Sequence, residues 1–269
     1  MKILVLGDVM GPSGIKAIKE KLPNLIKKKK VDFVEVNGEN AADNGLGISK
    51  KNTDDIFGAG TDVITSGNHI WDQKETMEFI QDEKRLLRPE NSLKPVPGNG
   101  YGIFKSRNNK NVAVINLMAN VFMKKSEDVF ESAKKYIKKV KLKENADFIV
   151  VDLHGETTSE KMAMAYLFDG KVTILVGTHT HIPTSDHRVM EKGTAYQTDI
   201  GMCGDYNSVI GMNRDNSLSK FLKESSTKNH YPALGEATIS GLLVTADEKT
   251  GLAIDAQPII MGGALQERI

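Results

Sequence analysis

The chain has 269 residues, of which 39% are hydrophobic, and this is enough to bury a sizeable core as one large α/β domain or two small ones. Its 36 Lys and Arg residues balance 35 Asp and Glu residues, so the net charge of +1 gives no sign of a broad polyanion-binding surface, and no stable nucleic-acid partner is expected. Cys203 is the only cysteine, no charged-then-apolar leader opens the chain, and no apolar run approaches the roughly 20 residues that span a bilayer, so we expect a soluble, cytoplasmic protein without disulfides or membrane association.

The first half of the chain alternates short apolar strands with helices. Strands are predicted at Lys2–Leu6, Phe33–Val36 and Val63–Thr65, and the helices that follow them reach to about Lys30 or span Lys50–Phe57 and Lys74–Gln81. Prolines and glycines over residues 85–111 instead predict loops and a short edge strand near Gly102–Phe104.

The second half of the chain contains more strands. They are predicted at Val112–Leu117, Phe148–Val151, Val172–Val176, Thr194–Thr198, Ala237–Thr245 and Leu252–Pro258. An amphipathic helix is predicted over Glu127–Lys143. A further helix is predicted over Ser159–Phe168, with Ser159 as its cap. A glycine-bearing segment over 199–211 and a polar stretch to Tyr231 carry no predicted element. Because no repeat or linker is visible, we predict one domain over residues 1–269.

Side chains able to bind a metal follow five of these strands. They are Asp8, then Glu39 with Asn40, then Asn68 with His69, then His154, and finally His179 with His181. Ligands of open α/β sheets bind outside the carboxyl ends of the strands, where these side chains are expected to meet. Each has a structural explanation when taken alone, since Asp caps helices, Asn occupies turns and a single His packs in a core. Their joint occurrence favours a functional site.

The number and type of these residues indicate the chemistry. They exceed what one four-coordinate zinc ion needs, and their mixture of nitrogen and oxygen ligands suits iron, manganese or zinc better than magnesium or calcium. Two ions ~3.5 to 4 Å apart can clamp a phosphate and share a bridging hydroxide that attacks phosphorus in line with the leaving oxygen. Hydrolysis of a phosphoester is therefore the predicted reaction.

The order of these motifs resembles the calcineurin-like metallophosphoesterases, and most closely the YmdB-like branch, which are bacterial cyclic-nucleotide phosphodiesterases. The matching stretches span nearly the whole chain and are Gly7–Gly11, Asn37–Asn40, Gly67–His69, Asp152–Lys161, Gly177–Pro183 and Thr198–Gly204. The resemblance implies an α/β fold, a two-sheet α/β/β/α sandwich of the calcineurin-like type. This fold agrees with the strand-rich second half.

The resemblance also implies a role for each residue. Asp8 and His181 would hold a first metal, while Asn68, His154 and His179 hold a second. Glu39 would bridge the two metals, and Asn40 would lie beside the first as a ligand or a phosphate contact. His69 would be the general acid that protonates the leaving alkoxide. The wider superfamily usually has Asp-x-His where this chain has Asp8-Val9-Met10, and a bridging Asp where this chain has Glu39. Both departures fit the narrower branch.

The cofactors implied are two divalent or trivalent transition-metal ions, iron or manganese in the first place and zinc as the alternative. The partner implied is a small-molecule phosphodiester or nucleotide, in particular a 2',3'-cyclic or 3',5'-cyclic nucleotide. A symmetric homo-oligomer is the default expectation.

Other functions stay open from the sequence. A phosphomonoesterase or nucleotidase can be built around the same metals, and a metal-binding regulatory protein with little turnover would keep the ligands but would not need His69. An amidohydrolase on a (β/α)8 barrel also carries a His-x-His pair, but on its first strand. Gly7–Gly14 lacks the spacing of a dinucleotide-binding loop.

Three further features have no assigned role. Cys203 lies among glycines and methionines and is expected to be inert packing. Ile70 and Trp71 follow His69 directly, and they are expected either to form an apolar wall near the site or to pack in the core. By the resemblance, residues 199–206 would reach the rim of the site.

Overall fold

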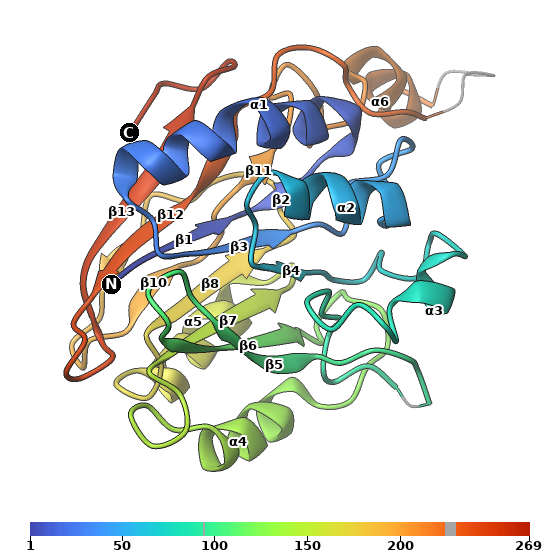
Figure 1. Cartoon of the computed structure of the whole chain (residues 1–269). Helices are drawn as coiled ribbons and strands as arrows, with labels where there is room; N and C mark the ends of the chain where they lie inside the picture. Colours follow the sequence, from blue (N-terminus) through green and yellow to red (C-terminus); the bar gives the residue numbers. More distant parts are fainter. Residues whose placement is uncertain (94, 224–229) are drawn as a thin grey trace.

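The computed structural model describes residues 1–93, 95–223 and 230–269. Two β-sheets pack face to face between two layers of helices (Figure 1). The first sheet has five strands in the order β13-β12-β1-β3-β4. These strands are β1 (Lys2–Leu6), β3 (Phe33–Asn37), β4 (Val63–Thr65), β12 (Ile239–Ala246) and β13 (Ala253–Met261). The strands β1, β3 and β4 run parallel, and β12 and β13 extend the sheet in antiparallel pairs.

The second sheet has six strands in the order β5-β6-β7-β8-β10-β9. These strands are β5 (Tyr101–Lys105), β6 (Asn111–Met118), β7 (Phe148–His154), β8 (Ile174–Thr178), β9 (Arg188–Val189) and β10 (Ala195–Gln197). The strands β6, β7, β8 and β10 are parallel, whereas the edge strands β5 and β9 are antiparallel to their neighbours. A small two-stranded sheet joins β2 (Asp8–Val9) to β11 (Met202–Cys203).

Helices cover the outer face of each large sheet. The helices α1 (Gly11–Lys29) and α2 (Lys50–Gly58) pack on the first sheet, and α4 (Val129–Lys139) and α5 (Thr158–Phe168) pack on the second (Figure 1). The short helices α3 (Thr76–Phe79) and α6 (Arg214–Phe221) complete the described elements. Within the described ranges, none of the helices is both long enough and apolar enough to cross a lipid bilayer. The predicted α/β/β/α sandwich is confirmed.

The apolar layers follow from the alternation of side chains along each strand. In β1, Leu4 and Leu6 face the helices, whereas Ile3 and Val5 face the other sheet. Because each central strand is covered on both faces, its sequence is a nearly continuous apolar run, and such runs predicted where these strands lie. The bounds of β7 and β8 differ from the prediction, since β7 continues to His154 and β8 begins and ends two residues later than expected.

Several predicted helices are shorter in the structure. The helix predicted over Lys74–Gln81 is reduced to α3, and the one predicted over Glu127–Lys143 ends at Lys139, because Val140 is extended and buried. The N-cap residue of α5 is Thr157, and Ser159 lies inside the helix, so the predicted cap is wrong. Helix α6 was not predicted within the polar stretch to Tyr231, because its sequence offers few apolar residues at helical spacing. Residues 224–229 of that stretch lie outside the described part of the chain.

The layer between the two sheets changes from apolar to polar towards the carboxyl ends of the parallel strands. On β7, Phe148 and Val150 belong to the inter-sheet core, and Asp152 and His154 continue the same face because side chains two residues apart on a strand point the same way. The Nδ2 atom of Asn37 at the end of β3 donates to Oδ2 of Asp152 over 2.9 Å. The ends of both sheets therefore meet in a polar, buried region.

Candidate metal centre

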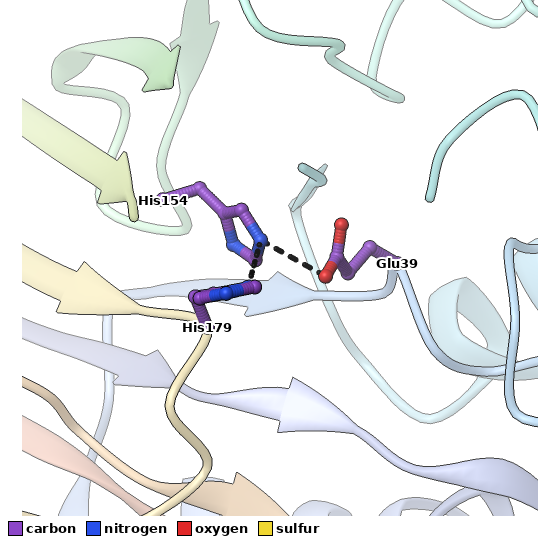
Figure 2. Close-up of side chains that lie close together, drawn as sticks. All are labelled: Glu39, His154 and His179. Carbon is purple, nitrogen blue, oxygen red and sulfur yellow. Dashed lines mark hydrogen bonds and ion pairs between the residues drawn. The ribbon is translucent and has the colours of Figure 1, made fainter. Parts of the chain in front are cut away.

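His154, the last residue of β7, lies at the middle of this region. Its Nε2 atom is 2.9 Å from Oε1 of Glu39, 3.1 Å from Oδ1 of Asn68 and 3.1 Å from Nδ1 of His179. We call these four residues the His154 group. Figure 2 shows Glu39, His154 and His179 converging, and one ligand atom from each lies within 4.8 Å of the others. Segments far apart in the chain thus bring four atoms that could bind a metal to one point.

Hydrogen bonds behind His154 fix the orientation of its ring. Its Nδ1 atom is 2.9 Å from the hydroxyl of Thr178, and that hydroxyl donates its own proton to Oδ1 of Asp152 over 2.7 Å. Thr178 must therefore accept from Nδ1–H of His154. When the ring is neutral, Nε2 therefore carries no proton, and its lone pair faces the oxygens of Glu39 and Asn68. These oxygens can only accept hydrogen bonds.

Such a convergence of acceptors is stable only around a positive charge. Burial alone would lower the pKa of His154, but the carboxylate of Glu39 outweighs burial and raises that pKa to about 9. Burial likewise opposes ionisation of Glu39, yet His154 lowers the pKa of Glu39 to about 2. One shared proton can bridge a single pair of these atoms, whereas a metal ion can bind all of them together.

His179 is held so that its Nδ1 atom faces the same point. Its Nε2 atom is 3.1 Å from Oε2 of Glu156, and its backbone N–H donates to Oδ2 of Asp8 over 3.2 Å. Burial and the neighbouring His154 lower the pKa of His179 to about 3, so its ring is neutral. A carboxylate that accepts from the far nitrogen of a histidine is the usual way in which proteins orient a metal-binding ring.

Asp8, Asn40 and His181 form a second set of acceptors, which we call the His181 group. The Nδ1 atom of His181 donates to the carbonyl oxygen of Ile210 over 2.7 Å, so Nε2 faces Oδ1 of Asn40 at 3.2 Å and Oδ1 of Asp8 at 4.0 Å. Asn40 presents its oxygen because its Nδ2 atom donates to the carbonyl of Gly45.

Asp8 is the residue of this group that most needs a partner. Its Oδ1 atom is fully buried and accepts no hydrogen bond from the described residues. Burial raises the pKa of Asp8 to about 6, although His181 and His154 oppose this effect. An unpaired buried carboxylate oxygen costs several kcal/mol unless a cation satisfies it.

The segment that carries both histidines has a strained backbone. His179 has a φ of 101° and His181 a φ of 66°, a region that residues other than glycine rarely adopt. The fully buried ammonium of Lys161 donates to the carbonyl of Thr178 over 2.8 Å and to Oδ2 of Asp199 over 2.9 Å. The same oxygen of Asp199 accepts the N–H of Thr180 over 3.1 Å. This ion pair holds the loop between the two histidines from behind.

His69 lies beside the His154 group but does not join it. Its backbone N–H donates to Oε2 of Glu39 over 3.0 Å, and its Nδ1 atom is 2.6 Å from Oδ2 of Asp72. No described residue hydrogen-bonds to its Nε2 atom, and its side chain is 26% exposed. His69 can therefore present Nε2 to a bound molecule while Asp72 holds its other nitrogen.

Gly67 allows this close packing. A Cβ atom at Gly67 would lie 2.2 Å from Cδ2 of His154 and 2.4 Å from Oε2 of Glu39, so no other residue fits. Together with the orphaned oxygen of Asp8 and the two sets of converging acceptors, this cradle fits transition-metal ions with mixed nitrogen and oxygen ligands. The structure thus brings together all eight predicted site residues, with His69 at the edge.

The chain as a whole has relatives among known proteins. Residues 4–259 match the YmdB-like protein family. The chain belongs to this family. A relative from Bacillus subtilis (strain 168), named 2',3'-cyclic-nucleotide 2'-phosphodiesterase, is 40% identical over 261 residues, which are 97% of either chain.

Two solved structures resemble this YmdB-like protein over nearly its whole length. One is a Mycoplasma pneumoniae protein described as a novel phosphatase, with 36% identity, a TM-score of 0.88, and coverage of 97% of this chain and 93% of that one. The other is a hypothetical protein from Thermus thermophilus, with 33% identity, a TM-score of 0.87, and coverage of 97% of this chain and 99% of that one. The predicted family and fold are both confirmed.

Several residues that shape this YmdB-like site had no role in the sequence-based prediction. They are Asp152 and Thr178, which set the ring of His154, Glu156, which orients His179, and the Lys161–Asp199 pair. Asp152 could have been found, because it stands two residues before His154 and shares its face of β7. Lys161 could not have been found from the sequence, because a lysine side chain ordinarily faces water.

Cys203 is not a nucleophile in this structure. It is buried, and its sulfur lies 3.5 Å from the carbonyl oxygen of Ser240. Burial raises the pKa of its thiol to about 12, so the thiolate is not formed at neutral pH.

Glu35 gives a testable pH dependence. The hydroxyl oxygen of Thr65 lies 2.6 Å from Oδ2 of Asp152 and 3.2 Å from Oε1 of Glu35, and its single proton goes to the nearer carboxylate, that of Asp152. Asp152 also accepts hydrogen bonds from Asn37 and Thr178. Burial raises the pKa of Asp152 too, but its three hydrogen-bond donors make it the better placed of the two carboxyl groups to hold a negative charge. Burial, and secondly Asp152, raise the pKa of Glu35 well above its ordinary value of 4.5. The folded protein therefore holds the proton of Glu35 to a higher pH than the unfolded chain does.

Because folded Glu35 keeps a proton that the unfolded chain releases above pH ~4.5, wild-type stability falls as the pH rises from there towards the folded pKa. We expect Glu35→Gln, which imitates the protonated acid, to gain stability relative to wild type over this range, by at most ~1.4 kcal/mol per pH unit. Urea unfolding of both metal-free proteins between pH 5 and 8 measures the difference. The exposed Glu20→Gln is the control, and a pH-independent difference for Glu35→Gln would contradict the assignment.

Proposed function

We propose that this YmdB-like protein is a metal-dependent phosphodiesterase that hydrolyses cyclic nucleotides, with 2',3'-cyclic nucleotides as the first candidates. The observation that carries the proposal is the convergence of unprotonated acceptors on Nε2 of His154, which calls for a cation. The name of the relative from Bacillus subtilis supports the substrate class. The phosphatase-like relative from Mycoplasma pneumoniae supports phosphoester hydrolysis more generally.

Two metal ions fit the two sets of acceptors. The His181 group, which is Asp8, Asn40 and His181, would hold the first. Asn68, His154 and His179 would hold the second, with Glu39 between them. Iron or manganese suits these mixed ligands, and zinc is the alternative. When bound, such ions neutralise the phosphate and activate water.

The remaining chemistry belongs to His69. Hydrolysis breaks the bond between phosphorus and a ribose oxygen, and that oxygen needs a proton as it leaves. Nε2 of His69 is free of hydrogen bonds to the described residues and can supply the proton, and Asp72 holds the other ring nitrogen in place. The hydrogen bond from the His69 amide to Glu39 fixes the distance between this acid and the metal centre.

Metal content and a substrate panel test the proposal. We expect about two transition-metal ions per chain, because two sets of acceptors converge at the site. Elemental analysis that finds none, with none taken up after addition of manganese or iron, would refute the centre. With manganese present, cyclic nucleotides and bis-p-nitrophenyl phosphate should react faster than p-nitrophenyl phosphate. The reverse order would favour a phosphomonoesterase.

A further inference from the structure

An apolar pocket opens directly beside the His154 group. It has a volume of about 210 Å³ and is lined by segments that include Asn68, Trp71, Leu93, Met118, Lys124 and Lys125. Asn68 belongs to both places, since its Oδ1 atom lies 3.1 Å from Nε2 of His154 while the residue also forms part of the pocket wall. A molecule whose phosphate lies at the metal centre can therefore extend its other end into this pocket.

The walls of the pocket suit a flat, apolar ring. Both Trp71 and Leu93 are strongly apolar, yet neither is fully buried. Trp71 is only partly buried against the core, and Leu93 is 46% exposed. A ring placed against them would remove this apolar surface from water, which stabilises the complex. Met118, which is 5% exposed, adds an adaptable apolar contact.

The two lysines at the pocket differ in their availability. Lys124 donates to the carbonyl oxygen of Asn68 over 2.7 Å and lies 3.1 Å from Asp72, so its charge is already paired. Lys125 makes no hydrogen bond or ion pair with any residue that the structure describes. With respect to those residues, Lys125 is thus a free cationic donor beside an apolar wall. Ring nitrogens and carbonyl oxygens on the edge of a nucleobase are acceptors for such a donor.

We propose that this pocket binds the base of the nucleotide whose phosphate lies at the metal centre, with Trp71 and Leu93 against its face and Lys125 at its edge. This inference rests on the proposed function and adds the part of the substrate that the metals do not contact. It makes Trp71, Leu93 and Lys125 determinants of specificity, and none of them takes part in bond breaking.

Trp71 is the only tryptophan in the chain, so its fluorescence reports directly on the pocket. We expect a nucleoside 3'-monophosphate to quench the emission of the metal-loaded protein in a saturable manner. Ribose 3-phosphate, which lacks the base, and inorganic phosphate should leave the emission unchanged. If the nucleotide competes with substrate but does not alter the emission, the pocket is not the base site.

A kinetic comparison tests the same inference without Trp71. The substrates are a 2',3'-cyclic nucleotide and the 2',3'-cyclic phosphate of methyl riboside, which has no base. For Leu93→Ala, the ratio of kcat/KM between them should fall ~10-fold, as expected for removing a leucine contact. Leu234→Ala, which changes an exposed leucine outside the pocket, is the control and should keep the ratio.

The two proposals fail in different ways. If wild-type protein hydrolyses both substrates with equal kcat/KM, or if Leu93→Ala slows both equally, the base pocket is wrong while the phosphodiesterase stands. If wild-type protein carries metals and hydrolyses neither cyclic phosphate, the proposed function itself is wrong.

Discussion

Replacing His69 with alanine is expected to leave the metal content unchanged and to lower kcat on a cyclic nucleotide by ~10²- to 10⁴-fold, the usual contribution of a general acid. The ring of His69 is bound to Asp72 and not to the His154 group, so its removal takes no ligand away. Its backbone N–H, which holds Glu39, is kept in the variant. Elemental analysis and steady-state kinetics on the purified protein measure the two effects.

The leaving group separates an acid from a residue that only positions the site. A ribose oxygen leaves as a strongly basic alkoxide and needs a proton, whereas p-nitrophenolate leaves without one. His69→Ala should therefore lose far less activity on bis-p-nitrophenyl phosphate than on a cyclic nucleotide. Equal losses on both substrates would mean that His69 does not supply the proton. The exposed His230→Ala serves as the control.

Replacing Glu39 with glutamine is expected to remove most of the bound metal and most of the activity. The loss of activity should exceed ~100-fold, because losing a residue that only supports a metal ligand already lowers activity ~10- to 100-fold. Glu39 is fully buried, and its two oxygens contact His154 and the amide of His69, so its charge acts on the whole His154 group. Glutamine keeps the size of the side chain but lacks the charge. The fold should therefore be retained.

Thermal unfolding adds a second measurement for Glu39→Gln. A metal that binds only the folded state raises Tm. Addition of manganese to metal-free wild-type protein should raise Tm, and addition to the variant should raise it much less. If the variant keeps both its metal content and the rise in Tm, Glu39 is a structural residue and not a ligand. Glu20→Gln is the matched control on the surface of α1.

The strands were predictable because they are bounded by strong local signals. The observed β1 and β4 have the predicted bounds, since each is an apolar run that ends at glycine or at small polar residues. Helices were less predictable where apolar spacing was weak. The ends of α3 and α4 are set by tertiary packing, and α6 forms from a polar sequence that gives little helical periodicity.

The sequence by itself determined which chemical groups stand at the ends of the strands, because a side chain's type and its place after an apolar run are local properties. Only the tertiary structure decided how those groups face one another. The tautomer of His154 depends on Thr178, and its other nitrogen faces Asn68, which is 86 residues away in the chain. The same holds for the buried Lys161–Asp199 pair and for the pocket at Trp71. Hydrogen bonds and pockets join side chains that no local periodicity connects, so they appear only when the two sheets have packed together.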